Sequence, residues 1–313
     1  MPDIVVMFFL LGLLAGVVKS DLAIPKAAYD TLSLLLMLTI GLKGGMALYG
    51  NLGWSLLPEL VAVAALGAVI PLALMPVLRR LVRLSPADSA SLAAHYGSVS
   101  AGTFAVALAF AEGRNLPIGA EVTLYLVMME LPAIMVAIAL YRRYKGAEPG
   151  EAMQGIWHET LTNRGVILLA GGAVIGAMYG PMEGANVTDL LTGAFHAVLA
   201  LFLLQMGLTA AETLRPIPWY HWRLLIFALA APPLLALAGL AVGLALGLPA
   251  GSLLILTALA ASASYIAAPA AMRTAIPQAN IGLAMLAALG FTFPLNVILG
   301  IPVYHQLIIW LAG

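Results

Sequence analysis

Residues Ser91–Gly113 read SLAAHYGSVSAGTFAVALAFAEG, and residues Thr257–Asn280 read TALAASASYIAAPAAMRTAIPQAN. Both stretches are apolar enough for a membrane, yet small and hydroxyl residues gather at their centres. The first cluster contains Gly97, Ser98, Ser100, Gly102 and Thr103, and the second contains Ser262, Ser264 and Pro269. In lipid, every backbone polar group needs a partner, so an interrupted helix must be enclosed by protein or border a water-filled cavity.

One such cluster alone favours close helix packing, because small residues let neighbouring backbones approach each other. Two clusters at corresponding positions favour a different interpretation. Paired interruptions in the two halves of a chain indicate the binding site of a secondary transporter. We therefore predict two broken helices, the fourth and the ninth, that meet at mid-membrane and form a binding site.

The composition excludes most other classes of protein. Hydrophobic residues make up 63% of the chain, charged residues make up 9%, and the mean hydropathy is +1.03. These values are typical of a membrane protein and not of a soluble globular domain. The chain has no cysteine, which excludes thiolate catalysis and Cys-ligated metal sites. Its formal net charge is zero, so it lacks the basic footprint of a nucleic-acid-binding protein.

Ten apolar segments come near the length of about 20 residues that a membrane-spanning helix needs. They are Ile4–Val18, Ala27–Tyr49, Trp54–Leu78, Ala90–Ala111, Ile118–Tyr141, Val166–Tyr179, Leu190–Ala211, Leu224–Leu248, Ser252–Met272 and Gly282–Leu311. The predicted fold class is therefore an all-α polytopic membrane protein. Asp3, and no basic residue, precedes the first segment, so we interpret that segment as a permanent helix and not as a removed signal peptide.

The basic residues predict the orientation of the chain. Nearly all lysines and arginines fall in the connections that follow odd-numbered segments, and these connections face the cytoplasm according to the positive-inside rule. Both termini are then expected outside the cytoplasm of a bacterial inner membrane. Lys43 and Arg114 are the exceptions. We expect Lys43 to extend its long side chain to the outer surface.

The two halves of the chain resemble each other. Gly41-Leu42-Lys43 in the second segment recurs as Gly207-Leu208-Thr209 in the seventh, and Ser98 corresponds to Ser264 at the same spacing. An odd number of spans in each half puts the halves in opposite orientations. We therefore predict two inverted repeats of five helices, a plan used by many secondary transporters.

The predicted repeats cover residues 1–142 and 165–313, and a polar linker covers residues 143–164. The linker is interpreted as a solvated connection on the cytoplasmic side, because most loops are surface connections. A docking site for a cytoplasmic regulator is the alternative interpretation.

Glu130 lies within an apolar run, one residue before Leu131-Pro132. A carboxylate inside a membrane span is costly and indicates a functional site. The alternative is a structural carboxylate that is bonded to serines or to the backbone. Together with the hydroxyls of Ser98, Ser100 and Thr103, Glu130 offers hard oxygen ligands, which suit Na⁺ better than a soft metal.

Broken helices also predict how an anion is held. The first N–H groups of a helix fragment are unpaired and lie at the positive end of its dipole. No lysine or arginine lies within either cluster. Two such helix ends that face each other can therefore hold an anion through backbone groups. A sodium-coupled anion symporter is the function that combines both features.

These residues carry a resemblance to the SbtA-type sodium-dependent bicarbonate transporter family. The similar stretches are Gly41–Ala47, Gly97–Leu108, Leu126–Ala133 and Ala260–Asn280. The resemblance implies a homotrimer of ten-helix protomers that transport bicarbonate and Na⁺ by an elevator mechanism. It implies no organic cofactor and no enzymatic activity.

The resemblance also implies site residues. The substrate-binding positions are Gly97, Ser98, Ser100, Ala101, Gly102, Thr103, Ala263, Ser264, Tyr265 and Ile266. The sodium-binding positions are Ser100, Thr103, Glu130, Ser262 and Ser264. The chain departs from the family pattern in five places: Tyr265 replaces an acid, Ala263 and Gly102 replace serines, Glu130 replaces an aspartate and Lys43 replaces a threonine. The central linker is also short, which argues against a PII-like regulatory partner.

Three other functions remain open at this point. The first is a cation/proton antiporter that uses Glu130, and the second is a symporter of another small carboxylate. The third is an intramembrane enzyme or sensor that works through His95, Ser98 and Ser100, although these residues do not have the spacing of a known base–nucleophile pair.

Overall fold

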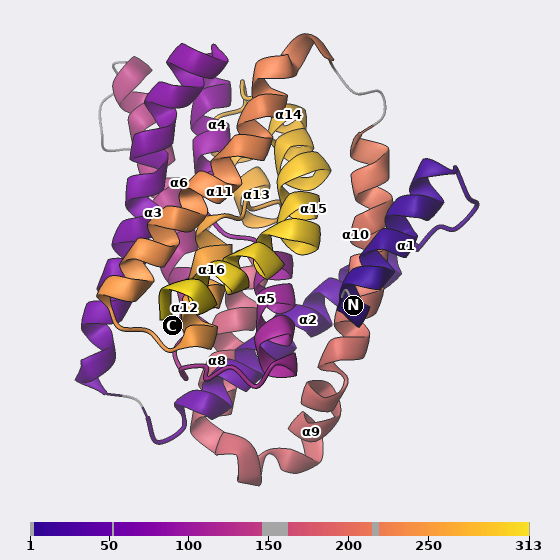
Figure 1. Cartoon of the computed structure of the whole chain (residues 1–313), viewed down its shortest axis with the longest axis vertical. Helices are drawn as coiled ribbons and strands as arrows, with labels where there is room; N and C mark the ends of the chain where they lie inside the picture. The colour runs from indigo at the N-terminus through magenta and orange to yellow at the C-terminus, as the bar shows by residue number, and fades with distance from the viewer. Residues whose placement is uncertain (1–2, 52, 146–161, 215–218, 313) are drawn as a thin grey trace.

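The computed structural model describes residues 3–51, 53–145, 162–214 and 219–312, and within these ranges the chain forms helices and turns without any strand (Figure 1). The α-helices are α1 (Ile4–Val17), α2 (Lys26–Leu48), α3 (Leu57–Val77), α4 (Pro86–Gly97), α5 (Ala101–Gly113), α6 (Leu124–Lys145), α8 (Arg164–Glu183), α9 (Ala185–Gly193), α10 (Phe195–Thr213), α11 (Trp222–Ala245), α12 (Ala250–Ala260), α13 (Ala267–Ala275), α14 (Ile281–Met285), α15 (Phe293–Leu295) and α16 (Ile301–Ala312). Shorter turns are 3-10 helical at Trp54–Leu56 and Trp219–His221 and π-helical at Leu78–Val82, Leu286–Thr292 and Asn296–Gly300. Most of the predicted linker, residues 146–161, lies outside the described residues.

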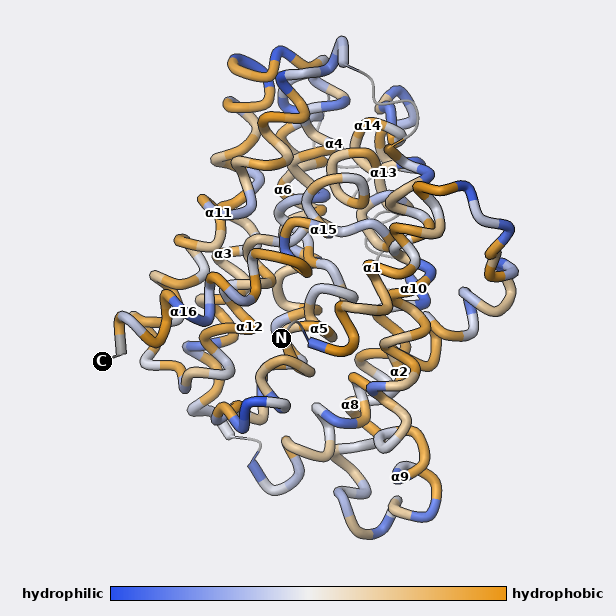
Figure 2. Tube along the Cα trace, turned by 45° about the vertical axis from the view of Figure 1, so that its right-hand side comes forward, coloured by the Kyte–Doolittle hydropathy of each residue, from blue (hydrophilic) through white to orange (hydrophobic). Residues whose placement is uncertain are grey.

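Eight helical stretches in the described ranges are long and apolar enough to cross a membrane. Two of the ten predicted segments correspond to shorter apolar helices: α1 has 14 residues, and α12 has 11 residues before the chain is interrupted. Figure 2 shows hydrophobic residues along the helices and hydrophilic residues mainly at their ends and in the connections. The structure is therefore that of a polytopic membrane protein.

The predicted and observed bounds differ most at two places. α6 begins at Leu124 and not at Ile118, because hydrogen bonds from Gly119 N to Ser252 Oγ (2.8 Å) and from Gly251 N to Pro117 O (2.9 Å) hold the preceding loop against the start of α12. The predicted seventh segment is divided into α9 and α10. α9 ends at Gly193, a residue type with weak helix propensity.

The helices pack in two groups. α1 packs along α10, α2 packs along α8, and α2 also contacts α10; we call these four helices the frame group. The core group contains α3 to α6 and α11 to α16, in which α3 packs on α6 and α11 packs on α12. Figure 1 shows α1 and α10 on the right and α3, α6 and α11 on the left. The groups meet mainly where α10 contacts α5 and the turn Leu286–Thr292.

Glycines let the frame helices touch backbone to backbone. A Cβ at Gly12 of α1 would collide with the carbonyl oxygen of Leu204 in α10. A Cβ at Gly172 of α8 would likewise lie within 2.9 Å of the carbonyl oxygen of Leu38 in α2. Small residues are what membrane helices use for such approaches, because no hydrophobic driving force acts between helices in lipid.

In a second set of contacts, the glycine belongs to the other helix of each pair, α10 or α2. A Cβ at Gly207 of α10 would collide with the carbonyl oxygen of Phe9 in α1, and a Cβ at Gly41 of α2 would lie 2.5 Å from that of Leu169 in α8. The α1–α10 and α2–α8 pairs are thus built alike. Gly41 and Gly207, which correspond in the two halves of the sequence, make the same kind of contact: each lies against a carbonyl oxygen of its paired helix.

An ion pair links the two groups. Lys43 Nζ of α2 lies 2.6 Å from Glu112 Oε1 of α5, and 4.5 Å from the centre of the Phe195 ring. The side chain of Lys43 is 24% exposed, and its extension to the outer surface stays a prediction. A partly buried ammonium group is stabilised by a partner carboxylate, and Glu112 supplies it.

Candidate functional site

The two interrupted helices cross and are hydrogen-bonded to each other. α4 and α5 are separated at residues 98–100, and α12 and α13 are separated at residues 261–266. The backbone N–H of Ser100 donates to Ser262 Oγ at 3.0 Å, and the N–H of Ser264 donates to the carbonyl oxygen of His95 at 2.7 Å. Both interruptions lie where the small-residue clusters predicted them.

A serine side chain accepts a hydrogen bond at the start of each helix that follows an interruption, α5 and α13. Ser100 Oγ accepts hydrogen bonds from the N–H and the hydroxyl of Thr103, both at 3.0 Å, at the start of α5. Ser264 Oγ accepts from the N–H of Ala268 at 3.2 Å at the start of α13. Ser100 is the N-cap of α5, a role that serine favours because it satisfies one N–H group without a partner within the helix. The N-cap position of α13 is Ile266, and Ser264 bonds the Ala268 N–H from two residues before it. The positive ends of both helices therefore begin at the crossing.

A cavity of about 20 Å³ lies beside the crossing. It is lined by Met37, Val99, Ser100, Ala101, Leu126, Glu130, Asn163, Gly165, Leu169, Ser264, Tyr265, Ile266 and Ala267. Its walls come from both helix groups, since α2 and α8 supply residues as well as α5, α6 and α13. The volume suits about one water molecule or a bare ion.

Glu130 is the ionisable acid of this cavity. Its carboxylate forms no hydrogen bond or ion pair with any described residue, and it lines the same cavity as Ser100 and Ser264. The interpretation of Glu130 as a structural carboxylate bonded to serines or to the backbone is therefore not what the structure shows. An unpaired carboxylate in a membrane span is costly, and a bound cation or proton is its natural partner.

The other predicted site residues lie behind the cavity wall. Gly97 packs where a Cβ would meet Pro71 and Ala133, and the buried hydroxyl of Ser98 has no hydrogen-bond partner among the described residues. Ser262 Oγ donates to the carbonyl oxygen of Leu259 at 2.8 Å in addition to accepting from Ser100. Thr103, Gly102 and Ala263 are buried and do not line the cavity. The structure thus brings together Ser100, Ala101, Glu130, Ser264, Tyr265 and Ile266.

Tyr265 and Ile266 also line a second, larger cavity of about 530 Å³. This cavity extends to Lys26, Arg164 and Arg273, and Arg164 Nη1 forms an ion pair with Asp30 Oδ1 at 3.2 Å. The Tyr265 ring packs edge-on against Phe293, with ring centres 5.6 Å apart. Tyr265 therefore lies between the small cavity and the larger one.

Two asparagines of the site were missed in the sequence. Asn163 lines the small cavity and caps α8 by accepting a hydrogen bond from the N–H of Gly165 at 2.9 Å. Asn296 Nδ2 donates to the carbonyl oxygen of Ala261 at 2.7 Å and so holds the second interruption. An asparagine before an apolar run is an N-cap signal, and one inside a span is a rare polar residue. Both signals were present in the sequence.

His95 does not form a catalytic pair with Ser98 or Ser100. His95 Nδ1 donates to the carbonyl oxygen of Ser91 at 2.7 Å, while Nε2 is buried and has no partner in the part of the chain that the structure describes. Neither nitrogen bonds Ser98 or Ser100. Within the described ranges, no group of three or more His, Cys, Asp or Glu residues could hold a metal ion.

A comparison with protein families agrees with this geometry. The model of the Na⁺-dependent bicarbonate transporter superfamily matches residues 4–309. The chain belongs to this superfamily. A search among curated proteins gave no match. Membership of the superfamily confirms the resemblance that the sequence indicated, and it makes the chain a multi-pass membrane transport protein and not an enzyme.

Proposed function

We propose that this chain is a sodium-coupled symporter of bicarbonate. The observation that carries the proposal is the unpaired carboxylate of Glu130 in a cavity that also contains two helix starts. A cation and an anion both have a suitable partner there. The superfamily match supports the same pair of ions.

Oxygen atoms around the cavity suit Na⁺. Glu130, Ser100 and Ser264 line the cavity, and Thr103 and Ser262 stand directly behind it through their hydrogen bonds with Ser100. Carboxylate and hydroxyl oxygens are hard ligands that favour such a cation over soft metals. We assign these five residues to the sodium site, with Glu130 as its charged member.

The anion is held by backbone groups and small side chains. The starts of α5 and α13 give the crossing a positive field, and no lysine or arginine is among the described residues that line the small cavity. We assign the anion to the segments 97–103 and 263–266, of which Val99, Ser100, Ala101, Ser264, Tyr265 and Ile266 line the small cavity. Bicarbonate is larger than the cavity of about 20 Å³, and Tyr265 lines both this cavity and the larger one. We propose that Tyr265 moves toward the larger cavity when the anion enters.

The helix groups suit an elevator mechanism. We propose that the core group moves as the carrier against the frame group, because the frame pairs are in tight backbone contact and the site lies in the core group at the boundary. Two inverted repeats of five helices would account for the similar construction of the α1–α10 and α2–α8 pairs. A homotrimer in a bacterial inner membrane with both termini outside the cytoplasm stays a prediction, as does the PII-like regulator against which the short linker argues.

The function is tested by uptake of labelled bicarbonate into proteoliposomes, with and without an inward Na⁺ gradient. Na⁺-driven accumulation that a protonophore does not reduce is the expected result. Formate and acetate serve as alternative small carboxylates in parallel assays. Accumulation that requires a proton gradient would instead support the antiporter that uses Glu130, and uptake of a carboxylate in place of bicarbonate would overturn the substrate.

A further inference from the structure

A groove of about 520 Å³ lies outside the crossing, between α3 and α11. Its floor is apolar and includes Leu74 and Val77 of α3 and Phe227, Ala231 and Leu235 of α11. The volume is in the range of pockets that hold small-molecule ligands. In a membrane such a groove borders the acyl chains of the lipid.

Three arginines stand at one end of the groove. Arg80 and Arg83 come from the end of α3, and Arg223 comes from the first turn of α11. The ion pairs of the described residues are Lys43–Glu112 and Arg164–Asp30, so none of the three arginines has a carboxylate partner among them. Arg79, one residue away, is different, because it donates to the Tyr144 hydroxyl at 3.2 Å.

The backbone directs these arginines to the groove end. α3 changes into a π-helical turn at Leu78–Val82, and Arg83 adopts a left-handed conformation with φ 65°. Arg83 is the C-cap of this turn, and a left-handed residue is a common way for a helix to end. α11 starts at Trp222 without a side-chain cap, which adds unpaired N–H groups to the positive charge.

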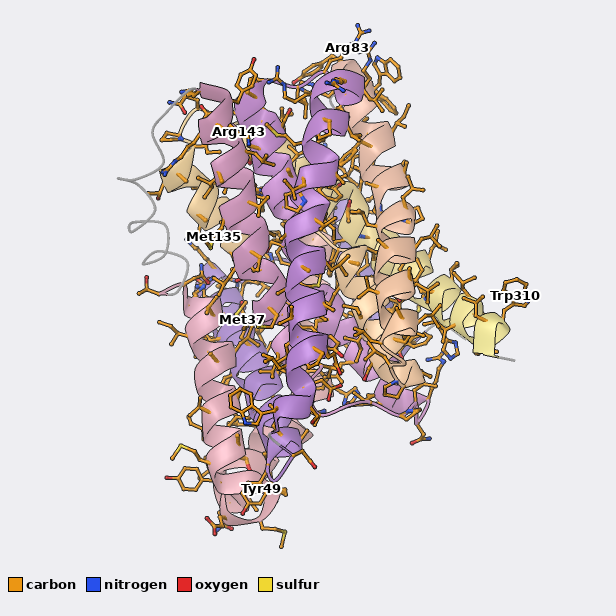
Figure 3. All side chains as sticks on the ribbon, turned by 90° about the vertical axis from the view of Figure 1, so that its left-hand side faces the viewer. Met37, Tyr49, Arg83, Met135, Arg143 and Trp310 are labelled. Carbon is orange, nitrogen blue, oxygen red and sulfur yellow. The ribbon has the colours of Figure 1, made fainter. Side chains whose placement is uncertain are left out.

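The aromatic residues mark this end as a membrane interface. Trp219, Tyr220 and Trp222 are exposed, and the Arg223 guanidinium lies 5.2 Å from the Trp222 ring. Tryptophan and tyrosine gather where lipid headgroups meet the acyl chains. Figure 3 shows Arg83 and Arg143 at one end of the molecule and Tyr49 at the other.

We propose that this groove binds an anionic phospholipid. The apolar floor receives an acyl chain, and Arg80, Arg83 and Arg223 bind the phosphate. Arginine suits this role because its planar guanidinium donates two hydrogen bonds to one phosphate group. Basic pockets between membrane helices recognise anionic headgroups in this way.

One carboxylate lies near the arginines. Asp88 lines an adjoining cavity with Arg83 and Arg223, but its oxygens accept from the hydroxyl of Ser85 at 2.7 Å and from the N–H of Asn280 at 2.7 Å. Asp88 therefore holds the start of α4 against the chain before α14. It does not form an ion pair with either arginine.

The proposal is tested by native mass spectrometry of the purified full chain in detergent. Dioleoylphosphatidylglycerol and dioleoylphosphatidylcholine are titrated separately, since they share acyl chains and differ in headgroup charge. We expect phosphatidylglycerol to bind at least about tenfold more tightly, in line with the attraction of basic residues to anionic lipid. Equal affinity for the two lipids would overturn the proposal.

Charge variants locate the site. Replacing Arg80, Arg83 and Arg223 together by glutamine should abolish the preference for phosphatidylglycerol. The matched control replaces Arg142, Arg143 and Lys145 of α6, which lie outside the groove lining, and should retain it. A preference that survives the first triple substitution, or is lost in the control, would contradict the assignment.

A variant that fills the groove with a large side chain provides a second test in case the triple arginine variant does not fold. Ala230→Trp places a large side chain from an exposed position into the groove and leaves all three arginines. It should weaken phosphatidylglycerol binding at least tenfold. Undiminished binding would overturn the proposal. Displacement of the lipid by excess inorganic phosphate would show that the arginines take phosphate alone, and this result also counts against a lipid site.

Discussion

The hydroxyl of Tyr265 occupies the space that a Cβ at Gly102 would fill. The same hydroxyl lies next to the Ser100 side chain and the Gly102 amide, but forms no hydrogen bond of good geometry. The SbtA-type pattern that the chain resembles has a serine in place of Gly102 and an acid in place of Tyr265. The two departures are therefore structurally linked: a tyrosine at one position requires a glycine at the other.

This link predicts a rescue. Gly102→Ala should destabilise the protein by about 1–3 kcal/mol, the usual cost of overpacking a filled interior. Adding Tyr265→Phe removes the atom that collides with the new Cβ and should recover most of the loss. Thermal unfolding of both single variants and the double variant measures the coupling. Additive effects would contradict the link.

Glu130→Ala should abolish Na⁺-dependent bicarbonate uptake, because the carboxylate is the charged ligand proposed for Na⁺. Glu130→Asp should keep part of the uptake, since a shorter side chain preserves the charge. Glu183→Ala, which removes an exposed acid at the end of α8, is the matched control and should transport normally. Unchanged Na⁺ dependence in Glu130→Ala would remove Glu130 from the site.

Tyr265→Asp should change the sodium requirement. The substitution adds a second carboxylate beside the cavity that contains Glu130. We expect a steeper dependence of uptake on Na⁺ concentration, consistent with an additional bound cation. A sodium titration of uptake, compared with that of Tyr265→Phe, measures the effect. An identical titration for both variants would mean that Tyr265 does not occupy a former sodium position.

The Lys43–Glu112 pair joins the frame group to the core group. Lys43→Glu places two like charges at this contact and should reduce uptake several-fold. The exchanged pair, Lys43→Glu with Glu112→Lys, should recover much of the activity by restoring the attraction. Initial uptake rates at low and high ionic strength provide the measurement, because partly exposed charges are screened by salt. If the exchanged pair does not recover the uptake rate, the attraction between the two charges is not what supports uptake.

Adjacent glycines in α8 offer a controlled test of the frame. Gly172→Ala adds a Cβ within 2.9 Å of the Leu38 carbonyl oxygen, whereas Gly171→Ala adds one in open space. We expect the first variant to lower the thermal unfolding midpoint and the second to leave it unchanged or raise it, because alanine favours helix. Equal midpoints would argue that α2 and α8 can separate without loss of stability.

The sequence was sufficient to predict both interruptions, and Glu130 lies beside them in the small cavity. Its role in binding sodium stays a prediction. Unpaired backbone and buried charge are so costly in lipid that they leave a clear pattern in the residues. The predicted helices also match the structure closely, apart from the start of α6 and the division between α9 and α10.

The direction in which individual side chains point could not be predicted in the same way. Whether Ser262 or Ser264 faces the cavity depends on the angle at which two fragments cross, and Ser262 in fact bonds the Ser100 amide. Asn163 reaches the cavity from α8, which is distant in the sequence from both interruptions. Such placements follow from three-dimensional packing and have no local signature.

The backbone contacts between α1 and α10 and between α2 and α8 have a mechanical consequence. Helices separated by long side chains can slide as those side chains change rotamer, but helices that touch through glycine have no such compliant layer. The frame group should therefore respond to load as a stiff body. Any displacement during a transport cycle then concentrates at its border with the core group, where the small cavity lies.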